Sequence, residues 1–297
     1  MDKEEFFKIN YISDFINYIN KKNYSYNTYT SYLNDLYYFY MYLDKNLCKV
    51  SEDDVRGYIT YLTEKKEHSS SIRRKISSLK SFYKFLYNNN YMEKKDYPLT
   101  KIVLPKQEKK LPKFLYYNEL LEIINESANT SDGVRDRLII EMLYATGVRI
   151  SELINIRTSD IDFNNRRIIV TGKGNKQRIV YYGEYAEEVL KKYLSTHKRN
   201  EYNYLFMNSR GEKITDRGVR YIIDNIMKKL SIKTHVTPHV LRHSFATDML
   251  NNGCDIKVVQ EILGHSSLRA TEIYTHVTNE SIKKVYYECF PRRDKDE

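Results

Sequence analysis

The first hundred residues carry a hydrophobic pattern of helical period, interrupted by short polar stretches. The pattern predicts four helices, over about residues 3–20, 26–44, 51–66 and 70–87. Ser51, which is followed by acidic residues, is typical of a helix N-cap. The fourth helix has a single hydrophobic stripe, formed by Ile72, Ile76, Leu79, Phe82, Tyr83 and Leu86. We therefore expect a small all-α bundle at the N-terminus.

A change in composition marks the end of this bundle. Three prolines lie within residues 98–112, in a lysine-rich segment without hydrophobic period. Proline stops helices and favours an extended backbone at the preceding residue. We therefore predict a helical domain over residues 1–95, a linker over 96–112 and a second domain over 113–297.

The second domain has a mixed pattern. Between residues 161 and 184, the turn signals "NN" and "GKGNK" separate β-branched and aromatic runs, which predicts about three antiparallel strands. Helical spacing dominates before and after them. Gly147 is placed to end one helix, and Thr237 and Pro238 are placed to begin another. The pattern predicts a mainly α fold whose second domain contains a small three-stranded sheet.

Composition narrows the class of protein. Of the 297 residues, 41% are hydrophobic and 30% are charged, which is typical of a soluble globular protein. The sequence has neither an apolar run of about 18 residues nor the pattern of a signal peptide, so we expect no membrane partner and a cytoplasmic location. Three scattered cysteines, Cys48, Cys254 and Cys289, indicate reduced thiols and not a disulfide framework or a zinc site.

The net charge of +10 favours a polyanionic partner. The basic excess is present in both halves of the chain, so one hypothesis is a nucleic acid that contacts both domains. The other is a moderately basic protein without such a partner. The 29 tyrosines do not indicate catalysis by themselves, because most occupy positions typical of packing.

Candidate chemistry begins with three short motifs. His239 and Arg242 are three residues apart on one predicted helix face, where both can donate hydrogen bonds to a phosphate diester. Arg149 follows a glycine break, and Glu152 lies one turn later, well placed to orient a basic group. Lys173 lies at a hairpin tip, where a lysine of lowered pKa can act as a general acid.

A fourth motif, "EILGHSSLRATEIYTHV", contains His265 and Tyr274. A free phenol has a pKa of about 10 and becomes a good nucleophile only beside cations. Taken singly, each of the four motifs also fits an ordinary structural or surface role. A zinc site formed by His235, His239 and His243 is a weak alternative, because its spacing is uncommon.

Taken together, these residues resemble the active site of the tyrosine recombinases, the lambda-integrase family. The set is ordered along the chain as Arg149, Lys173, His239, Arg242, His265 and Tyr274. Surrounding segments such as "ATGVRISEL", "TGKGNKQR" and "TPHVLRHSFAT" are most similar to the Xer type. The resemblance is more specific over residues 140–290 than over 1–100. It departs at Asp248, where relatives often have histidine, and in the ending "FPRRDKDE".

The resemblance implies a fold and a mechanism. An N-terminal four-helix SAM-like bundle would clamp DNA, and a C-terminal catalytic domain would act without cofactor or metal. Tyr274 would attack the scissile phosphate, leaving a 3′-phosphotyrosyl bond and a free 5′-hydroxyl. Arg149 and Arg242 would hold the non-bridging oxygens, and Lys173 would protonate the departing oxygen. The two histidines of the set would hydrogen-bond the phosphate or transfer protons, with Glu152 in a supporting role.

The resemblance also implies partners. The first is double-stranded DNA with a specific recombination site. The second is further subunits, either copies of this chain or a paralogue, which form a tetramer on the DNA by exchanging C-terminal tails. A Holliday junction would be the intermediate of the reaction. The role of the reaction would be the resolution of chromosome or plasmid dimers at cell division, with a septal DNA translocase as a further partner. Further expected DNA contacts are Arg73, Arg74, Lys80, Lys176, Arg178, Arg217 and Arg220.

Three alternatives remain open from the sequence. The first is the integrase of a mobile element, although lambda-type integrases usually carry an additional arm-binding domain for which residues 1–91 leave no room. The second is a type IB topoisomerase, which uses a similar site with little sequence preference. The third is a DNA-binding protein without catalysis, which would normally have lost one of the six residues.

Overall fold

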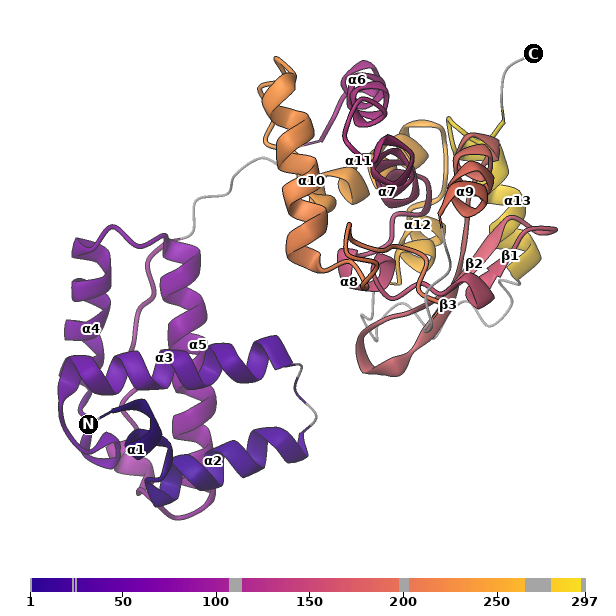
Figure 1. Cartoon of the computed structure of the whole chain (residues 1–297). Helices are drawn as coiled ribbons and strands as arrows, with labels where there is room; N and C mark the ends of the chain where they lie inside the picture. The colour runs from indigo at the N-terminus through magenta and orange to yellow at the C-terminus, as the bar shows by residue number, and fades with distance from the viewer. Residues whose placement is uncertain are drawn as a thin grey trace. The chain divides into compact units, whose positions relative to one another are not determined.

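The computed structural model describes residues 2–22, 24, 26–106, 114–197, 203–264 and 279–294, apart from the side chains of Asn27, Lys173 and Asn279. The chain divides into two compact units, Met1–Leu111 and Pro112–Glu297. Figure 1 labels the helices and strands of both.

The N-terminal unit is built from helices. They are α1 (Lys3–Phe7), α2 (Asn10–Lys21), α3 (Tyr26–Leu43), α4 (Glu52–Glu64) and α5 (Ser69–Asn88), with 3-10 turns η1 (Leu47–Lys49) and η2 (Lys94–Asp96). The helix predicted over residues 3–20 is divided in two, since α1 ends at Phe7 and α2 begins at Asn10, with Lys8 and Ile9 between them. The other three predicted helices are confirmed.

Two of these helices begin at residues that cap their first N–H groups. The Asp2 carboxylate accepts a hydrogen bond from the Glu5 N–H (2.8 Å). Ser51 Oγ accepts from the Asp54 N–H (3.3 Å), and the Asp54 carboxylate accepts in return from the Ser51 N–H (2.7 Å). Each cap contributes about 0.5–2 kcal/mol. Ser51 is therefore the N-cap that the sequence predicts.

The core of the N-terminal unit is rich in aromatic rings. Phe15 of α2 meets Phe82 of α5 edge to face, with ring centroids 5.2 Å apart. Residues 97–104 lie inside the predicted linker, but several of them pack against this core, with Leu99 buried. The first unit thus includes part of the segment that its composition marks as a linker.

The C-terminal unit contains helices and one sheet. Its elements are α6 (Tyr117–Ser127), α7 (Gly133–Thr146), α8 (Ile150–Leu153), η3 (Thr158–Asp160), β1 (Ile161–Asp162), β2 (Arg167–Thr171), η4 (Lys173–Asn175), β3 (Gln177–Tyr181), α9 (Glu184–Thr196), α10 (Asp216–Lys229), α11 (Pro238–Asn251), α12 (Ile256–Leu263) and α13 (Asn279–Cys289). Helix α7 is central, because α6, α9 and α11 all pack around it (Figure 1). Most side chains of α7 are buried.

Helix α7 ends as the sequence predicts, at Gly147. This residue has a φ of 59°, a left-handed conformation that favours glycine. A Cβ at this position would also lie 2.6 Å from the Phe245 ring of α11. The tight end of α7 sends the chain directly into α8, and this turn positions Arg149.

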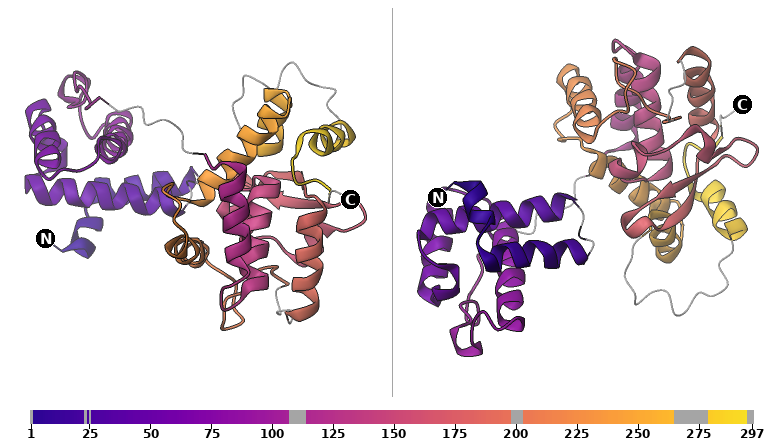
Figure 2. Two further views of the ribbon diagram at one scale, coloured as in Figure 1. Left: turned by 90° about the horizontal axis from the view of Figure 1, so that it is seen from above. Right: turned by 60° about the horizontal axis from the view of Figure 1, so that its bottom comes forward.

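The three strands form one antiparallel sheet in the order β1-β2-β3, which confirms the predicted sheet. In β2 and β3, Ile168 pairs with Val180 and Arg167 with Tyr181. Helices α12 and α13 pack against each other and against β3 (Figure 2). The sheet therefore lies beside the last two helices.

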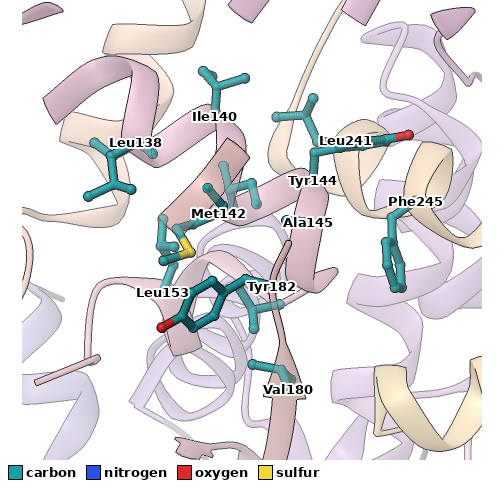
Figure 3. Close-up of a cluster of buried hydrophobic side chains, with 14 of the residues drawn as sticks. Leu138, Ile140, Met142, Tyr144, Ala145, Leu153, Val180, Tyr182, Leu241 and Phe245 are labelled. Carbon is teal, nitrogen blue, oxygen red and sulfur yellow. The ribbon is translucent and has the colours of Figure 1, made fainter. Parts of the chain in front are cut away.

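Helices α7 and α11 and strand β3 supply the centre of the hydrophobic core (Figure 3). Tyr144, Leu241, Phe245 and Val180 are completely buried there. Burying one such side chain contributes roughly 1.5–3 kcal/mol. The helices and strands that form this core confirm the predicted mainly α fold with a small antiparallel sheet.

Two expectations from composition concern the whole chain. Within the residues that the structure describes, no helix has both the length and the apolar character needed to cross a membrane. Cys48, Cys254 and Cys289 are free thiols, the last two of them buried. Burial raises the pKa of Cys254 to about 12, so this thiol stays protonated at neutral pH.

Candidate active site

Arg149 and Glu152 share one turn at the start of α8. Arg149 is the N-cap residue, and its N–H donates to Glu152 Oε2 (2.7 Å). Its guanidinium donates from Nη1 to Glu152 Oε1 (2.9 Å). The Arg149 side chain remains about one third exposed, whereas that of Glu152 is only 1% exposed. A buried carboxylate therefore holds a partly exposed arginine in place.

A second arginine contacts the same carboxylate. Arg178, on β3, donates from Nη1 to Glu152 Oε1 (2.6 Å) and from Nη2 to Oε2 (2.9 Å). Burial opposes ionisation of Glu152, but the hydrogen bonds from Arg178 and Arg149 outweigh it and lower the pKa of this carboxyl group. Glu152 is therefore ionised at neutral pH.

Arg242 is a third arginine at this place. Helix α11 begins as predicted, with Thr237 Oγ1 accepting from the Val240 N–H (3.2 Å) and proline in the first turn. One turn later, the buried Arg242 donates to the carbonyl oxygens of Gly147 and Leu263, the latter at 2.6 Å. These carbonyls lie at the ends of α7 and α12, so Arg242 joins three helices.

The arginines lie close enough to affect one another. Burial, and then the positive charges of Arg149 and Arg178, lowers the pKa of Arg242 to about 10. Glu152 is the one carboxylate that opposes this effect. Among the described residues, Arg149 and Arg178 therefore pair with one carboxylate, and Arg242 lies close enough to feel all three charges, so the site carries a surplus of positive charge.

The structure describes the other four predicted catalytic residues only in part. His239 lies on α11, one turn before Arg242, and is exposed. The backbone of Lys173 lies in η4, between β2 and β3. His265 and Tyr274 lie outside the described residues. Gly264, which directly precedes His265, accepts a hydrogen bond from Arg149 Nη2 (3.1 Å). The end of α12 is thus held at the arginines.

The seven basic residues predicted to contact DNA fall into two groups. Lys80, Lys176 and Arg217 are exposed. The remaining four, of which Arg74 is also exposed, donate to groups of the chain itself: Arg73 to Pro105 O, Arg74 to Asp35, Arg178 to Glu152 and Arg220 to Asp216. A DNA contact by any of them stays a prediction.

The place of Arg178 is the feature that sequence reasoning missed. In β3, Arg178 lies two residues before the buried Val180, so both side chains project from the same face of the strand. An arginine on the core side of a strand needs an ionised partner. That position in the alternating pattern was the available signal.

The alternative metal site has no support in the described part of the chain, where no group of three or more histidine, cysteine and acidic side chains is arranged to bind a metal ion. Of its three histidines, His235 and His239 are exposed and His243 is half-buried. Arginine, which is not a metal ligand of this type, dominates the candidate site instead.

Comparison with known proteins identifies the family. Residues 113–281 match the model of the phage integrase family, and residues 12–90 match that of the phage integrase N-terminal SAM-like domain. The tyrosine recombinase XerC of Anoxybacillus flavithermus is 44% identical over 292 residues, covering 94% of this chain and 96% of that protein. XerC of Listeria welshimeri is 42% identical with the same coverage.

Among solved structures, the XerA recombinase is 31% identical with a TM-score of 0.50, covering 98% of this chain and all of that one. The Tn1549 transposon integrase, solved in complex with transposon right end DNA, has a TM-score of 0.72 at 21% identity, and covers 89% of this chain and 94% of that one. At this identity the second likeness supports the fold alone. The chain belongs to the phage integrase family and, within it, to the Xer-type tyrosine recombinases, enzymes that break and rejoin DNA at specific sites.

Proposed function

We propose that this recombinase cuts DNA with Tyr274 and holds the scissile phosphate between Arg149 and Arg242. The tyrosine oxygen attacks phosphorus, the bond to the 5′-oxygen breaks, and a 3′-phosphotyrosyl ester remains. The free 5′-hydroxyl of a partner strand then attacks this ester and releases Tyr274. Because each step exchanges one phosphoester for another, no energy-supplying cofactor is consumed.

The surplus of positive charge at Glu152 is the observation that carries this proposal. Three guanidinium groups lie near one carboxylate, and burial together with the repulsion from Arg149 and Arg178 lowers the pKa of Arg242. An anion with two non-bridging oxygens would relieve the repulsion, and arginine offers the planar donor geometry that phosphate oxygens accept. In phosphoryl transfer, such fixed charge stabilises the transition state, where negative charge on these oxygens is greatest.

The remaining residues receive their roles by the same chemistry. Lys173 protonates the departing 5′-oxygen. His239 and His265 donate hydrogen bonds to the phosphate or transfer protons. The exposed basic residues Lys80, Lys176 and Arg217 neutralise DNA phosphates outside the site, which makes binding strongly dependent on salt.

The C-terminal segment supports a proposal about assembly. Arg292 donates from Nη2 to the buried Glu141 (2.6 Å), and its guanidinium carbon lies 4.2 Å from the centre of the Tyr185 ring. The Glu184 N–H donates to Arg293 O (2.7 Å), and a Cβ at Gly183 would lie 2.3 Å from Arg292 O. The C-terminal unit therefore forms a binding site that is shaped to receive this segment. We propose that the tail of a neighbouring subunit occupies the same site in a tetramer on DNA.

Resolution of chromosome or plasmid dimers is the role we propose for the reaction. It proceeds through a Holliday junction in the cytoplasm, where chromosomal DNA lies, and a septal DNA translocase is the candidate activator. Integration of a mobile element is the second candidate. The likeness to XerC over 94% of this chain favours the first.

The nucleophile can be tested with nicked DNA that carries a candidate recombination site. The nick lets the short cut fragment diffuse away, so the covalent complex accumulates and is seen as a shifted band on a denaturing gel. We expect this band with the wild-type chain and none with Tyr274→Phe. Tyr116→Phe, which removes a hydroxyl from an exposed ring, is the matched control and should behave as wild type.

Two results would contradict parts of the proposal. A covalent band that persists in Tyr274→Phe would exclude this tyrosine as the nucleophile. Relaxation of supercoiled plasmids that lack the recombination site would instead favour a topoisomerase of type IB.

A further inference from the structure

We infer that Arg178 is a positioning residue of the reaction, which neutralises Glu152 so that Arg149 keeps its charge for the scissile phosphate. The inference rests on the proposed function of Arg149. It differs from the sequence-based expectation that Arg178 contacts DNA.

The contacts of Arg178 are internal. Two of its nitrogens bind the two oxygens of Glu152 at 2.6 and 2.9 Å, and its Nε donates to the carbonyl oxygen of Ile262 at 2.9 Å. Its side chain is 15% exposed, compared with about one third for Arg149. All three of these donors bind acceptors within the protein. Arg178 therefore links β3 to the turn of Arg149 and to the end of α12.

Two glycines provide the space for this guanidinium. A Cβ at Gly264 would lie 2.9 Å from Arg178 Cδ and 3.1 Å from its Nε. A Cβ at Gly172 would lie 3.0 Å from Glu152 Oε1 and 3.9 Å from Arg178 Nη1. The two glycines come from different elements, one after β2 and one after α12. The backbone is therefore shaped around the pair of Arg178 and Glu152.

The charges explain why a second arginine is needed. Glu152 contacts Arg149 directly, so the carboxylate alone would cancel the charge of the group that binds phosphate. Arg178 contributes a compensating charge through a bidentate pair, the strongest geometry for a guanidinium and a carboxylate. Glu152 can then orient Arg149 without neutralising the site. Arg178 acts on the phosphate only through Glu152 and Arg149.

The test compares Arg178→Gln and Arg178→Lys with Arg167→Gln. Arg167 is the matched control, because it lies on the neighbouring strand and pairs with Asp162 (2.8 Å) away from the arginine cluster. Single-turnover cleavage of nicked DNA is measured over a range of DNA concentrations. Each variant is assayed on two substrates. One is ordinary DNA, and the other is DNA with a neutral methylphosphonate at the scissile position. Circular dichroism and thermal unfolding confirm that each variant is folded.

We expect Arg178→Gln to lower the maximal rate on ordinary DNA by about 10²-fold, as for a slightly misplaced catalytic group. The DNA concentration for half-saturation should change less than about twofold, and the defect should shrink on methylphosphonate DNA, where there is no phosphate charge to neutralise. Lysine keeps the charge but not the bidentate geometry, so Arg178→Lys should restore the rate only in part. Arg167→Gln should match wild type.

Other outcomes would overturn the inference. A change in half-saturation with an unaltered maximal rate would make Arg178 a DNA contact. An equal defect on both substrates would mean that Arg178 supports the fold and not the charge of the site. Wild-type activity in Arg178→Gln would exclude any role. Tyr274→Phe, measured in parallel, separates these outcomes from failure of the proposed nucleophile.

Discussion

Each unit of this recombinase contains a buried carboxylate bound by arginine, and the two differ in their charge balance. In the N-terminal unit, Asp35 accepts hydrogen bonds from Arg74 (2.9 Å) and Ser78 (2.7 Å). There, one negative charge meets one positive charge. In the C-terminal unit, Glu152 belongs to a cluster with three guanidinium groups.

The difference separates a structural ion pair from a site for a ligand. A balanced pair satisfies the groups that it buries and leaves nothing for a further anion to neutralise. An unbalanced cluster is held in place by other forces, here hydrogen bonds from Arg242 and Arg149 to main-chain carbonyls at the ends of α7 and α12. Both units pair arginine with a buried carboxylate. The number of positive charges around that carboxylate is therefore what distinguishes a ligand site from a structural ion pair.

The largest expected effect is on cleavage by Arg149→Gln. Removing one of the surplus charges should lower the maximal rate of single-turnover cleavage by about 10²–10³-fold. The thermal midpoint should stay close to that of wild type, because the glutamine amide can still donate to Glu152. A variant that loses stability and keeps its cleavage rate would break the comparison.

Arg74→Gln should give the opposite result. It leaves the buried Asp35 without its charged partner, so the free energy of unfolding should fall by about 1–3 kcal/mol. Urea denaturation followed by circular dichroism measures this, since the chain has no tryptophan to report by fluorescence. Cleavage at saturating DNA should be unchanged. A reduced dependence of DNA affinity on salt would instead support the predicted DNA contact of Arg74.

Inorganic phosphate should stabilise the protein at the Glu152 cluster. At about five times its Kd, a ligand that binds only the folded state adds about 1 kcal/mol. We expect a rise in the thermal midpoint with phosphate that is larger than the rise with sodium chloride of equal ionic strength. The difference should shrink in Arg149→Gln and persist in Arg74→Gln. An equal response in both variants would mean that phosphate acts elsewhere.

Acid should weaken the cluster through Glu152. The folded state lowers the pKa of this carboxyl group, so the unfolded chain binds more protons in acid. The stabilisation is present above the unfolded pKa of about 4.3 and is lost as the pH falls through the lower pKa of the folded state. Glu152→Gln should therefore lose less stability than wild type between pH 6 and pH 3. Parallel loss in both proteins would contradict this.

Much of the fold could be read from the sequence because its signals are local. The period of the hydrophobic residues, the cap at Ser51 and the glycine end of α7 each depend on a few neighbouring residues. The break between α1 and α2 was missed, since the hydrophobic pattern continues across Ile9 without a proline or glycine to interrupt it.

The site was predictable only in part for a different reason. The order of Arg149, Arg242 and their neighbours along the chain indicates the chemistry, but not which side chains share a carboxylate. The bond between Arg178 and Glu152 joins residues 26 positions apart, on a strand and a helix. Such a contact depends on tertiary packing, which no local pattern specifies.

The carbonyl oxygens that hold Arg242 have a consequence for how the gene can vary. Because Gly147 O and Leu263 O belong to the main chain, no codon change at these positions removes the acceptor atoms themselves. The vulnerability lies instead in the left-handed glycines that end the two helices, Gly147 and Gly264, where a single added methyl group would collide with Phe245 or Arg178. A substitution at either glycine should therefore disturb the position of Arg242 without changing any reacting residue.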